Sequence, residues 1–184
     1  MAGKPDVFRP VSDYALLVAH GKLIAVVAAE EGPGRRDIIM AAIQRRPGIH
    51  KSQLQADLDM AWGTLTHHVH QLHRRRRISM LQDGHRVALF PARIPAIHHA
   101  ALAQFAQPLV RRVVDVVRLR GASSIQEVAD ALDESRKPVT RCLKALAREG
   151  VMTRDAHGWG RFEVVEQRVA SLEQAVLLGR SSDA

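Results

Sequence analysis

Polar and cationic side chains between Ala61 and Arg76 have the types and spacing to bind a polyanion. Leu65, His68, Val69 and Leu72 recur at intervals of three and four, which predicts one inward face of a helix. The outward positions are Trp62, Gly63, Thr64, Thr66, His67, His70, Gln71 and Arg74. Arg, Gln and Thr can reach base edges or phosphate oxygens. The pattern indicates a helix held by one face and offering donors on the other.

The same pattern returns 74 residues later in the chain. The matched sets are Leu54, Leu58, Leu65, Thr66, Val69 and Leu72 against Val128, Leu132, Val139, Thr140, Leu143 and Leu146. The outward positions of the second copy are Ser135, Arg136, Lys137, Thr140, Arg141 and Lys144. A constant offset through consecutive segments indicates two copies of one small unit, so the repeat decides the architecture.

Each copy is predicted to be three helices followed by a two-stranded hairpin. The predicted ranges are helices 35–46, 52–58 and 61–76 with strands 78–82 and 85–90, then helices 109–119, 125–132 and 137–149 with strands 151–154 and 161–165. Asp83-Gly84 between two β-prone runs predicts a tight turn in which both residues have positive φ. The fold class is therefore mainly α with small β-hairpin wings, as two winged helix-turn-helix domains in tandem.

The expected domain organisation follows from these elements. It comprises an N-terminal arm with a helix or strand extension (1–34), a first module (35–91), a connector helix (92–107), a second module (108–165) and a C-terminal helix with its tail (166–184). In the connector, Ile97, Ala101 and Leu102 are expected to share a packed face. The C-terminal stripe of Val169, Leu172, Ala175 and Val176 can pack on its own module or on a second subunit.

Net charge supports an anionic partner and differs between the modules. The chain has a formal charge of +8, with 27 Lys and Arg against 19 Asp and Glu. Residues 35–77 hold nine Lys or Arg against three Asp, whereas residues 108–150 hold nine against six acids. The first module should therefore attract phosphate more strongly. The Arg74–Arg77 run is interpreted as a phosphate clamp at the helix end. The alternative is a set of solvated charges that interact favourably with the negative end of the helix dipole.

The stretch from Ser52 to Phe90, and above all the string from Trp62 to Leu72, resembles the winged helix-turn-helix domain of prokaryotic MarR- and ArsR-like regulators. Residues 137–152 resemble it more loosely. The resemblance implies binding of double-stranded DNA, with the last helix of each module in the major groove and the hairpin as a wing, in a transcriptional regulator. The candidate DNA-binding residues are Lys51, Trp62, Thr64, Thr66, His67, His70, Gln71, Arg74, Arg75, Arg77, His85, Arg86, Arg136, Lys137, Thr140, Arg141, Lys144, Trp159 and Arg161.

Other classes of function have weaker support in the sequence. Nucleoid architecture and a winged-helix module that holds a protein partner stay open as alternatives. No nucleophile, phosphate-loop or zinc-protease motif is present, so we expect no enzyme, cofactor or metal site. His67 and His73 diverge around the helix axis, which disfavours a metal site there. Cys142 is expected to be a buried thiol. A cytoplasmic, nucleoid-associated protein without a membrane span is expected, with a homodimer possible through the C-terminal or N-terminal helix.

Overall fold

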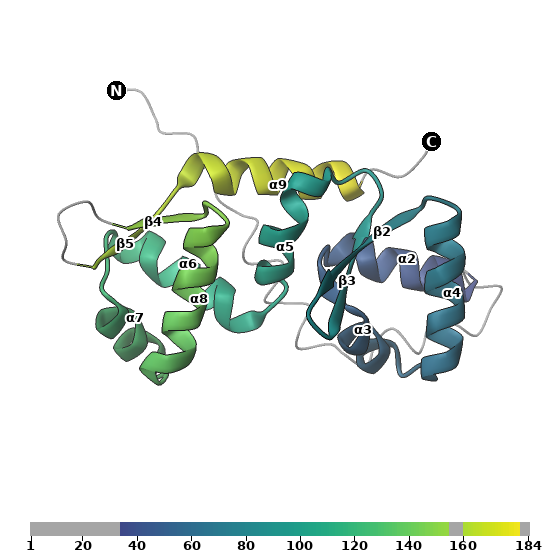
Figure 1. Ribbon diagram of the computed structural model, residues 1–184, viewed down its shortest axis with the longest axis horizontal. Helices are drawn as coiled ribbons and strands as arrows, with labels where there is room; N and C mark the ends of the chain where they lie inside the picture. Colours follow the sequence, from purple (N-terminus) through teal and green to yellow (C-terminus); the bar gives the residue numbers. More distant parts are fainter. Residues whose placement is uncertain (1–33, 155–159, 181–184) are drawn as a thin grey trace, which may run out of the picture.

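The computed structural model describes residues 34–154 and 160–180. The expected N-terminal extension and the candidate residue Trp159 lie outside these described residues. The described part is mostly helical, with two small antiparallel sheets (Figure 1). This agrees with the fold class predicted from the sequence.

The first module contains three helices and a three-stranded sheet. Its elements are α2 (Arg35–Arg45), β1 (Ile49–His50), α3 (Lys51–Leu58), α4 (Trp62–Arg74), β2 (Ile78–Asp83) and β3 (Arg86–Pro91). The strands lie in the order β1-β3-β2 and all pairs are antiparallel. The short β1 was not predicted, because two residues carry no alternation that a sequence pattern could reveal.

The turn of the first hairpin differs from the prediction by one residue. Asp83 pairs with Arg86, so the two loop residues are Gly84 and His85 rather than Asp83 and Gly84. Only Gly84 has a positive φ, at 58°, whereas the prediction required it of both turn residues. A two-residue loop with glycine first needs only one positive φ. Strand β2 therefore extends through Asp83 before the chain reverses.

The second module repeats the arrangement with a smaller sheet. Its elements are α6 (Pro108–Arg120), α7 (Ile125–Leu132), α8 (Arg136–Arg148), β4 (Met152–Arg154) and β5 (Phe162–Val164). A single bridge joins Ser123 to Phe162. It takes the place of the β1–β3 pairing in the first module. Helix α7 begins with a capping box, in which the Ser124 side chain and Glu127 each accept a backbone N–H.

Backbone geometry repeats at the 74-residue offset. Asp59 and Asp133, which end α3 and α7, have φ of 45° and 52°. Arg76 and Gly150, just after α4 and α8, have φ of 55° and 70°. The N–H of the next residue donates to a carbonyl five residues back in both copies, at 2.9 Å. Glycine adopts this left-handed conformation without strain. Arg76 has a Cβ, so the same conformation is strained there.

Two apolar clusters form the core, and one of them crosses the boundary between the modules. Leu54, Leu65 and Val69 belong to a cluster within the first module. The larger cluster joins the second module to Phe90 and Leu102 from β3 and the connector. The connector is thus packed, as predicted, but Ile97 is 74% exposed rather than on the buried face with Ala101 and Leu102.

The connector consists of a 3-10 turn, η2 (Ala96–His98), followed by α5 (His99–Phe105). The His99 ring stacks on Phe90 with centroids 4.1 Å apart and planes inclined by 4°. Its Nε2 lies 3.0 Å from the Ile94 carbonyl oxygen, to which a protonated Nε2 donates. Gly48 has φ of 87° and approaches α5 so closely that a Cβ would lie 2.6 Å from the Leu102 oxygen. These contacts fix the first module to the connector.

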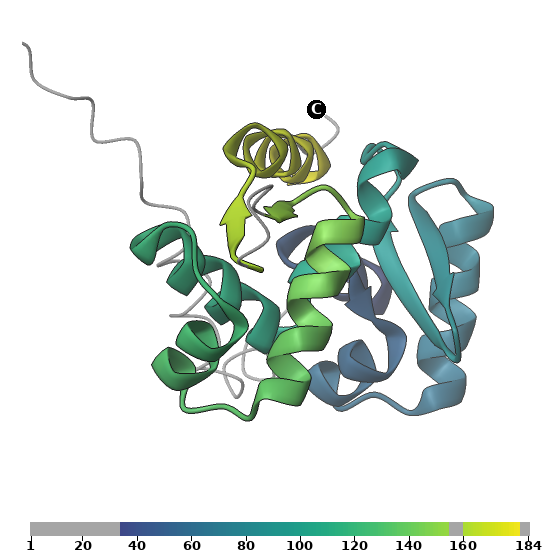
Figure 2. The ribbon, with the colours of Figure 1, turned by 60° about the vertical axis from the view of Figure 1, so that its left-hand side comes forward.

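Helix α9 (Glu166–Arg180) lies along one edge of the molecule and covers parts of both modules (Figures 1 and 2). Its buried residues are Val169, Leu172, Ala175 and Gly179. Near one end, Arg168 donates to the Ile97 and Glu149 carbonyl oxygens. Near the other, a Cβ on Gly179 would lie 2.8 Å from the Ile94 side chain, so the helix packs closely there. Of the two predicted placements, the apolar stripe therefore packs on its own chain, and it reaches beyond its own module.

The sequence predicted a buried thiol at Cys142. Cys142 is buried, and burial raises the pKa of its thiol, so the thiolate is disfavoured at neutral pH.

Within residues 34–154 and 160–180, every helix is too short or too polar to cross a bilayer.

Candidate nucleic-acid interface

Helix α4 buries the three aliphatic residues that the sequence predicted on its inward face. Leu65, Val69 and Leu72 are buried, whereas Trp62 is 49% exposed. Lys51 at the start of α3 places its Nζ 4.3 Å from the centre of the Trp62 ring. Partial burial lowers the pKa of Lys51 from its ordinary value. The ring thereby fixes a cation at the beginning of the helix that would enter a groove.

The polar positions along α4 differ in how freely they can bind. His67 and His70 are exposed, whereas Thr64, Thr66 and Gln71 are half-buried. The Thr66 hydroxyl donates to the Trp62 carbonyl oxygen at 2.7 Å, and Thr140 makes the same bond to Arg136 in the second module. These threonines can still accept hydrogen bonds, but their donors are used within the helix. His68, predicted to face inward, is half-buried and lines a surface groove.

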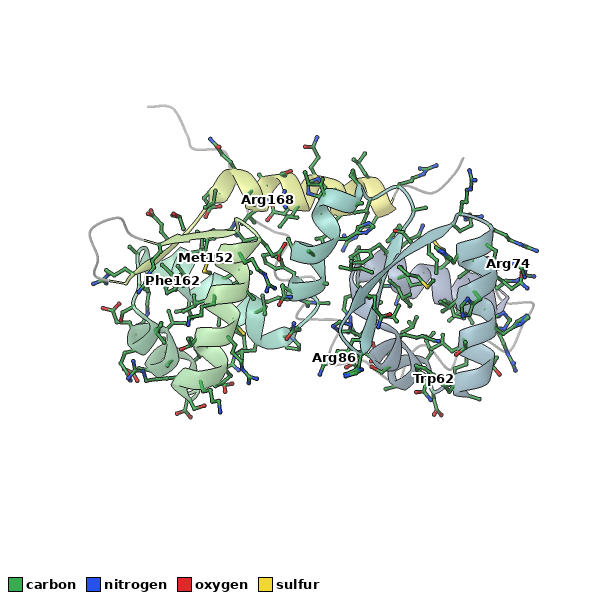
Figure 3. All side chains as sticks on the ribbon, in the orientation of Figure 1. Trp62, Arg74, Arg86, Met152, Phe162 and Arg168 are labelled. Atoms are coloured by element: carbon green, nitrogen blue, oxygen red, sulfur yellow. The ribbon has the colours of Figure 1, made fainter. Side chains whose placement is uncertain are left out.

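Arg74–Arg77 extend the cationic surface past the end of α4. All four residues are exposed, and none has a carboxylate partner among the described residues. The left-handed backbone at Arg76 turns the chain there, so that the run leads directly into β2. In Figure 3, Arg74 extends outward from α4. Like charges held this close favour a polyanionic partner.

The wing adds His85 and Arg86, which are both exposed at the tip of the β2-β3 hairpin. Arg86 has no carboxylate partner within the described part of the chain. In Figure 3, Arg86 and Trp62 lie toward the same end of the first module, while Arg74 lies near its other end. The cationic positions of the first module are therefore spread along α4 and onto the wing.

A groove between α2 and α4 was not predicted from the sequence. It has a volume of about 250 Å³ and is lined by Arg36, His67, His68, Gln71 and Arg75. The pKa of His68 is lowered, first by burial and then by the charges of His67, Arg36 and Arg35. Arg35-Arg36 at the start of a helix was the available signal. The sequence carried no signal that α2 and α4 lie side by side, because only the packing of the helices brings them together.

The second module presents a shorter cationic face. Arg136, Lys137, Arg141 and Lys144 on α8 are exposed and have no carboxylate partner among the described residues. Helices α4 and α8 run in the same direction, and both begin at the lower edge of the molecule in the two ribbon views (Figures 1 and 2). The positive ends of their dipoles therefore lie on the same side.

Other arginines of the second module are engaged within the protein. Arg161, a candidate DNA-binding residue, donates to both carboxylate oxygens of Glu127 at 3.0 and 3.1 Å and to the Ala122 carbonyl oxygen at 2.9 Å. Arg112 pairs with Glu134 at 2.9 Å, and Arg118 pairs with Glu166 at 2.7 Å. These arginines have hydrogen bonds to lose before they could bind phosphate.

Histidine clustering does not produce a recognisable metal centre in the described residues. His67 and His68 meet edge to face, with ring centroids 5.5 Å apart. Nowhere in residues 34–154 or 160–180 do three or more His, Cys, Asp or Glu side chains form a group that could hold a metal ion.

Comparison with known proteins bears on the first module. Residues 33–102 match a family model described as an N-terminal HTH domain. With its hairpin, this segment is a winged helix-turn-helix domain. No curated protein matches the chain.

Solved structures give two further likenesses. One is the PcaV transcriptional regulator from Streptomyces coelicolor, solved with its natural ligand, at 22% identity and a TM-score of 0.31, covering 64% of this chain and 100% of that chain. The other is ScpB from Mycobacterium tuberculosis, at 15% identity and a TM-score of 0.29, covering 78% of this chain and 98% of that chain.

Proposed function

We propose that this protein binds double-stranded DNA through its winged helix-turn-helix modules and acts as a transcriptional regulator in the cytoplasm. The observation that carries the proposal is the exposed cationic run Arg74–Arg77 at the end of α4, which has no acidic partner among the described residues. A helix of this kind fits the major groove, and phosphate contacts at its ends set its position. A helix-turn-helix domain is a binding module, so no catalytic role is proposed.

The proposed roles follow the position of each side chain. His67, His70 and Gln71 of α4 face base edges, and Thr64 and Thr66 contribute acceptors. Arg74, Arg75 and Arg77 hold the backbone at one end of the helix, while Lys51 and Trp62 contact it near the other. The wing residues His85 and Arg86 reach the neighbouring backbone or minor groove. This division separates base readout from phosphate positioning.

The second module is proposed to contact DNA through Arg136, Lys137, Thr140, Arg141 and Lys144. Its contribution is smaller, because other cations of this module are paired within the protein. We leave Arg161 out of the proposed interface, since its guanidinium is held by Glu127 and the Ala122 carbonyl.

A protein-holding role for the second module has one observation in its favour. A shallow groove of about 380 Å³ has Ile125, Ala147 and Phe162 in its lining, together with Thr140, Lys144 and Arg154. Such a mixture suits an acidic peptide with an apolar side chain. If this role holds, replacing Lys144 and Arg154 leaves the DNA affinity of the intact protein unchanged.

The first test is a salt series with random duplex DNA and the full chain. Phosphate neutralisation predicts that log K falls linearly with log[salt], with a slope of about −0.9 for each phosphate contact. Absence of binding at low salt refutes DNA binding and favours the protein-holding alternative.

A second experiment separates a regulator from a nucleoid-architectural protein. Selection of bound sequences from a random pool yields a shared motif only if base edges are read. Replacing His70 or Gln71 with Ala then changes the selected motif in a regulator. In an architectural protein, the same replacements leave a pool without sequence preference.

A further inference from the structure

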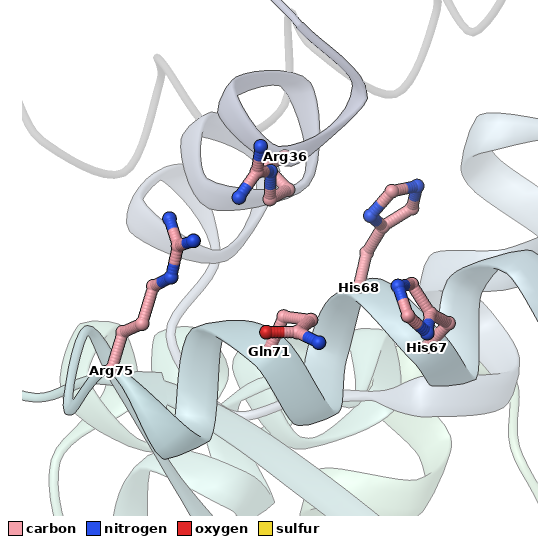
Figure 4. A pocket seen from close by; sticks show the side chains of 5 residues that line it. All are labelled: Arg36, His67, His68, Gln71 and Arg75. Atoms are coloured by element: carbon pink, nitrogen blue, oxygen red, sulfur yellow. The ribbon is translucent and has the colours of Figure 1, made fainter.

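The groove between α2 and α4, here called the α2–α4 groove, collects hydrogen-bond donors around an open space. Figure 4 shows Arg36 reaching from α2 toward α4, along which Arg75, Gln71 and His68 follow one another. His67 completes the lining. The groove thus has two guanidinium groups, two imidazoles and one amide, and no carboxylate.

Within the part of the chain that the structure describes, the groups around this groove do not compensate its positive charge. Arg35, beside Arg36, adds a further cation that acts on His68. Asp37 is the nearest acid along α2, and its carboxylate accepts the Gly34 N–H at 3.1 Å, so it serves as the helix cap. Arg36 and Arg75 have no carboxylate partner in the described part of the chain. An anion would satisfy donors that have no carboxylate partner among residues 34–154 and 160–180.

We propose that the α2–α4 groove binds a backbone phosphate of duplex DNA and that His68 takes up a proton from solvent as the phosphate enters. The proposal rests on the DNA-binding function proposed above and makes the affinity of that interface dependent on pH. The phosphate belongs to the strand that flanks α4, because Gln71 and His67 line the groove and also belong to the helix face toward DNA.

The proton uptake follows from the surroundings of His68. In the free protein, burial and the charges of His67, Arg36 and Arg35 hold its pKa below the ordinary value of 6.5. A phosphate in the groove offsets those charges and accepts a hydrogen bond from the protonated ring, so the pKa rises. Each unit of that rise is about a tenfold gain in affinity. We expect DNA affinity to increase about threefold to tenfold between pH 7.5 and pH 6.0.

The first arm of the test measures DNA affinity of the full chain against salt and pH. Arg36→Ala should lower the log–log salt slope by about one, because one phosphate contact is lost. His68→Gln keeps a neutral hydrogen-bonding side chain, and it should flatten the pH dependence. Arg45→Ala is the matched control, since it removes an exposed cation from the last turn of α2 and should leave both quantities unchanged.

The second arm follows the His68 ring by NMR in the free protein and in the DNA complex. A higher pKa of His68 in the complex supports the proposal. An unchanged pKa, or a pH dependence that is as large in His68→Gln as in the unsubstituted chain, overturns it even if DNA binds with a steep salt slope. Inorganic pyrophosphate that shifts the ring while DNA does not would reassign the groove to a free anion. Failure to bind any duplex instead refutes the function on which the proposal rests.

Discussion

The two modules share an arrangement of three helices and a hairpin but use their arginines differently. In the first module, Arg46 pairs with Asp57, while the cations after α4 and on the wing have no acidic partner among the described residues. In the second, Arg112, Arg148 and Arg161 each have a carboxylate partner. A shared fold therefore does not imply a shared surface. What distinguishes the modules is where acids lie around the same scaffold.

The largest expected effect is on DNA binding. Replacing Arg74, Arg75 and Arg77 with Ala should reduce the salt slope by about three, because three phosphate contacts disappear. Replacing Arg136, Lys137 and Lys144 should cause a smaller reduction. Fluorescence anisotropy with labelled duplex across a salt series measures both. An equal or greater reduction from the second set would contradict the asymmetry between the modules.

The next effect concerns the core that joins the modules. Phe90→Ala should lower the free energy of unfolding by about 3–5 kcal/mol, as expected for a fully buried aromatic residue. Because Phe90 belongs to the cluster that includes the second module, both modules should unfold together. Trp62 fluorescence in a Trp159→Phe background reports on the first module, and circular dichroism reports on all helices. Two separate urea transitions in the protein that keeps Phe90 would show that the modules unfold independently.

A smaller effect is expected where the repeat places different residues in one backbone conformation. Gly150→Arg should cost about 1–2 kcal/mol, since a side chain is strained at positive φ. None of the described residues lies within 4 Å of the added Cβ, so the cost is conformational rather than steric. Arg76→Gly should stabilise the first module by a lesser amount. Thermal unfolding measures both, and a stable Gly150→Arg variant would count against the equivalence of the two positions.

His99 adds a pH dependence at the contact between β3 and the connector. Burial lowers its pKa below 6.5, although the Ile94 carbonyl acts in the opposite direction. The folded state thus favours the neutral ring, so its stabilising contribution is present above pH 6.5 and is lost as pH falls through the lowered pKa. Urea unfolding at pH 5, 6 and 7 should show decreasing stability toward acid. His99→Gln should reduce that dependence, and an unchanged profile would exclude His99 as its source.

The smallest effect tests the internal pairing of the second module. Glu127→Gln weakens the bond to Arg161 and the α7 cap, so a small decrease in Tm is expected. A freed Arg161 should slightly steepen the salt dependence of DNA binding. An unchanged slope with a lowered Tm would mean that Arg161 has a structural role only.

Local patterns account for most of what could be predicted. The spacing of Leu65, Val69 and Leu72 fixes the buried side of α4, because residues three and four apart share one helix face. The 74-residue repeat aligns Arg76 with Gly150 of the second copy, and the two residues share a positive φ, at 55° and 70°. The turn at Gly84-His85 was misplaced by one residue, since either loop fits the same β-prone flanks.

The sequence by itself determined the helices, the hairpins and their repetition, since these depend on residues close together in the chain. Only the tertiary structure decided which charges stay free and which surfaces form. Arg118 and Glu166 are 48 residues apart, and Arg161 and Glu127 are 34 apart, so no local pattern relates them. The α2–α4 groove and the placement of α9 across both modules depend equally on packing between distant segments. The physical reason is that ion pairs and grooves require proximity in space, which spacing along the chain does not encode.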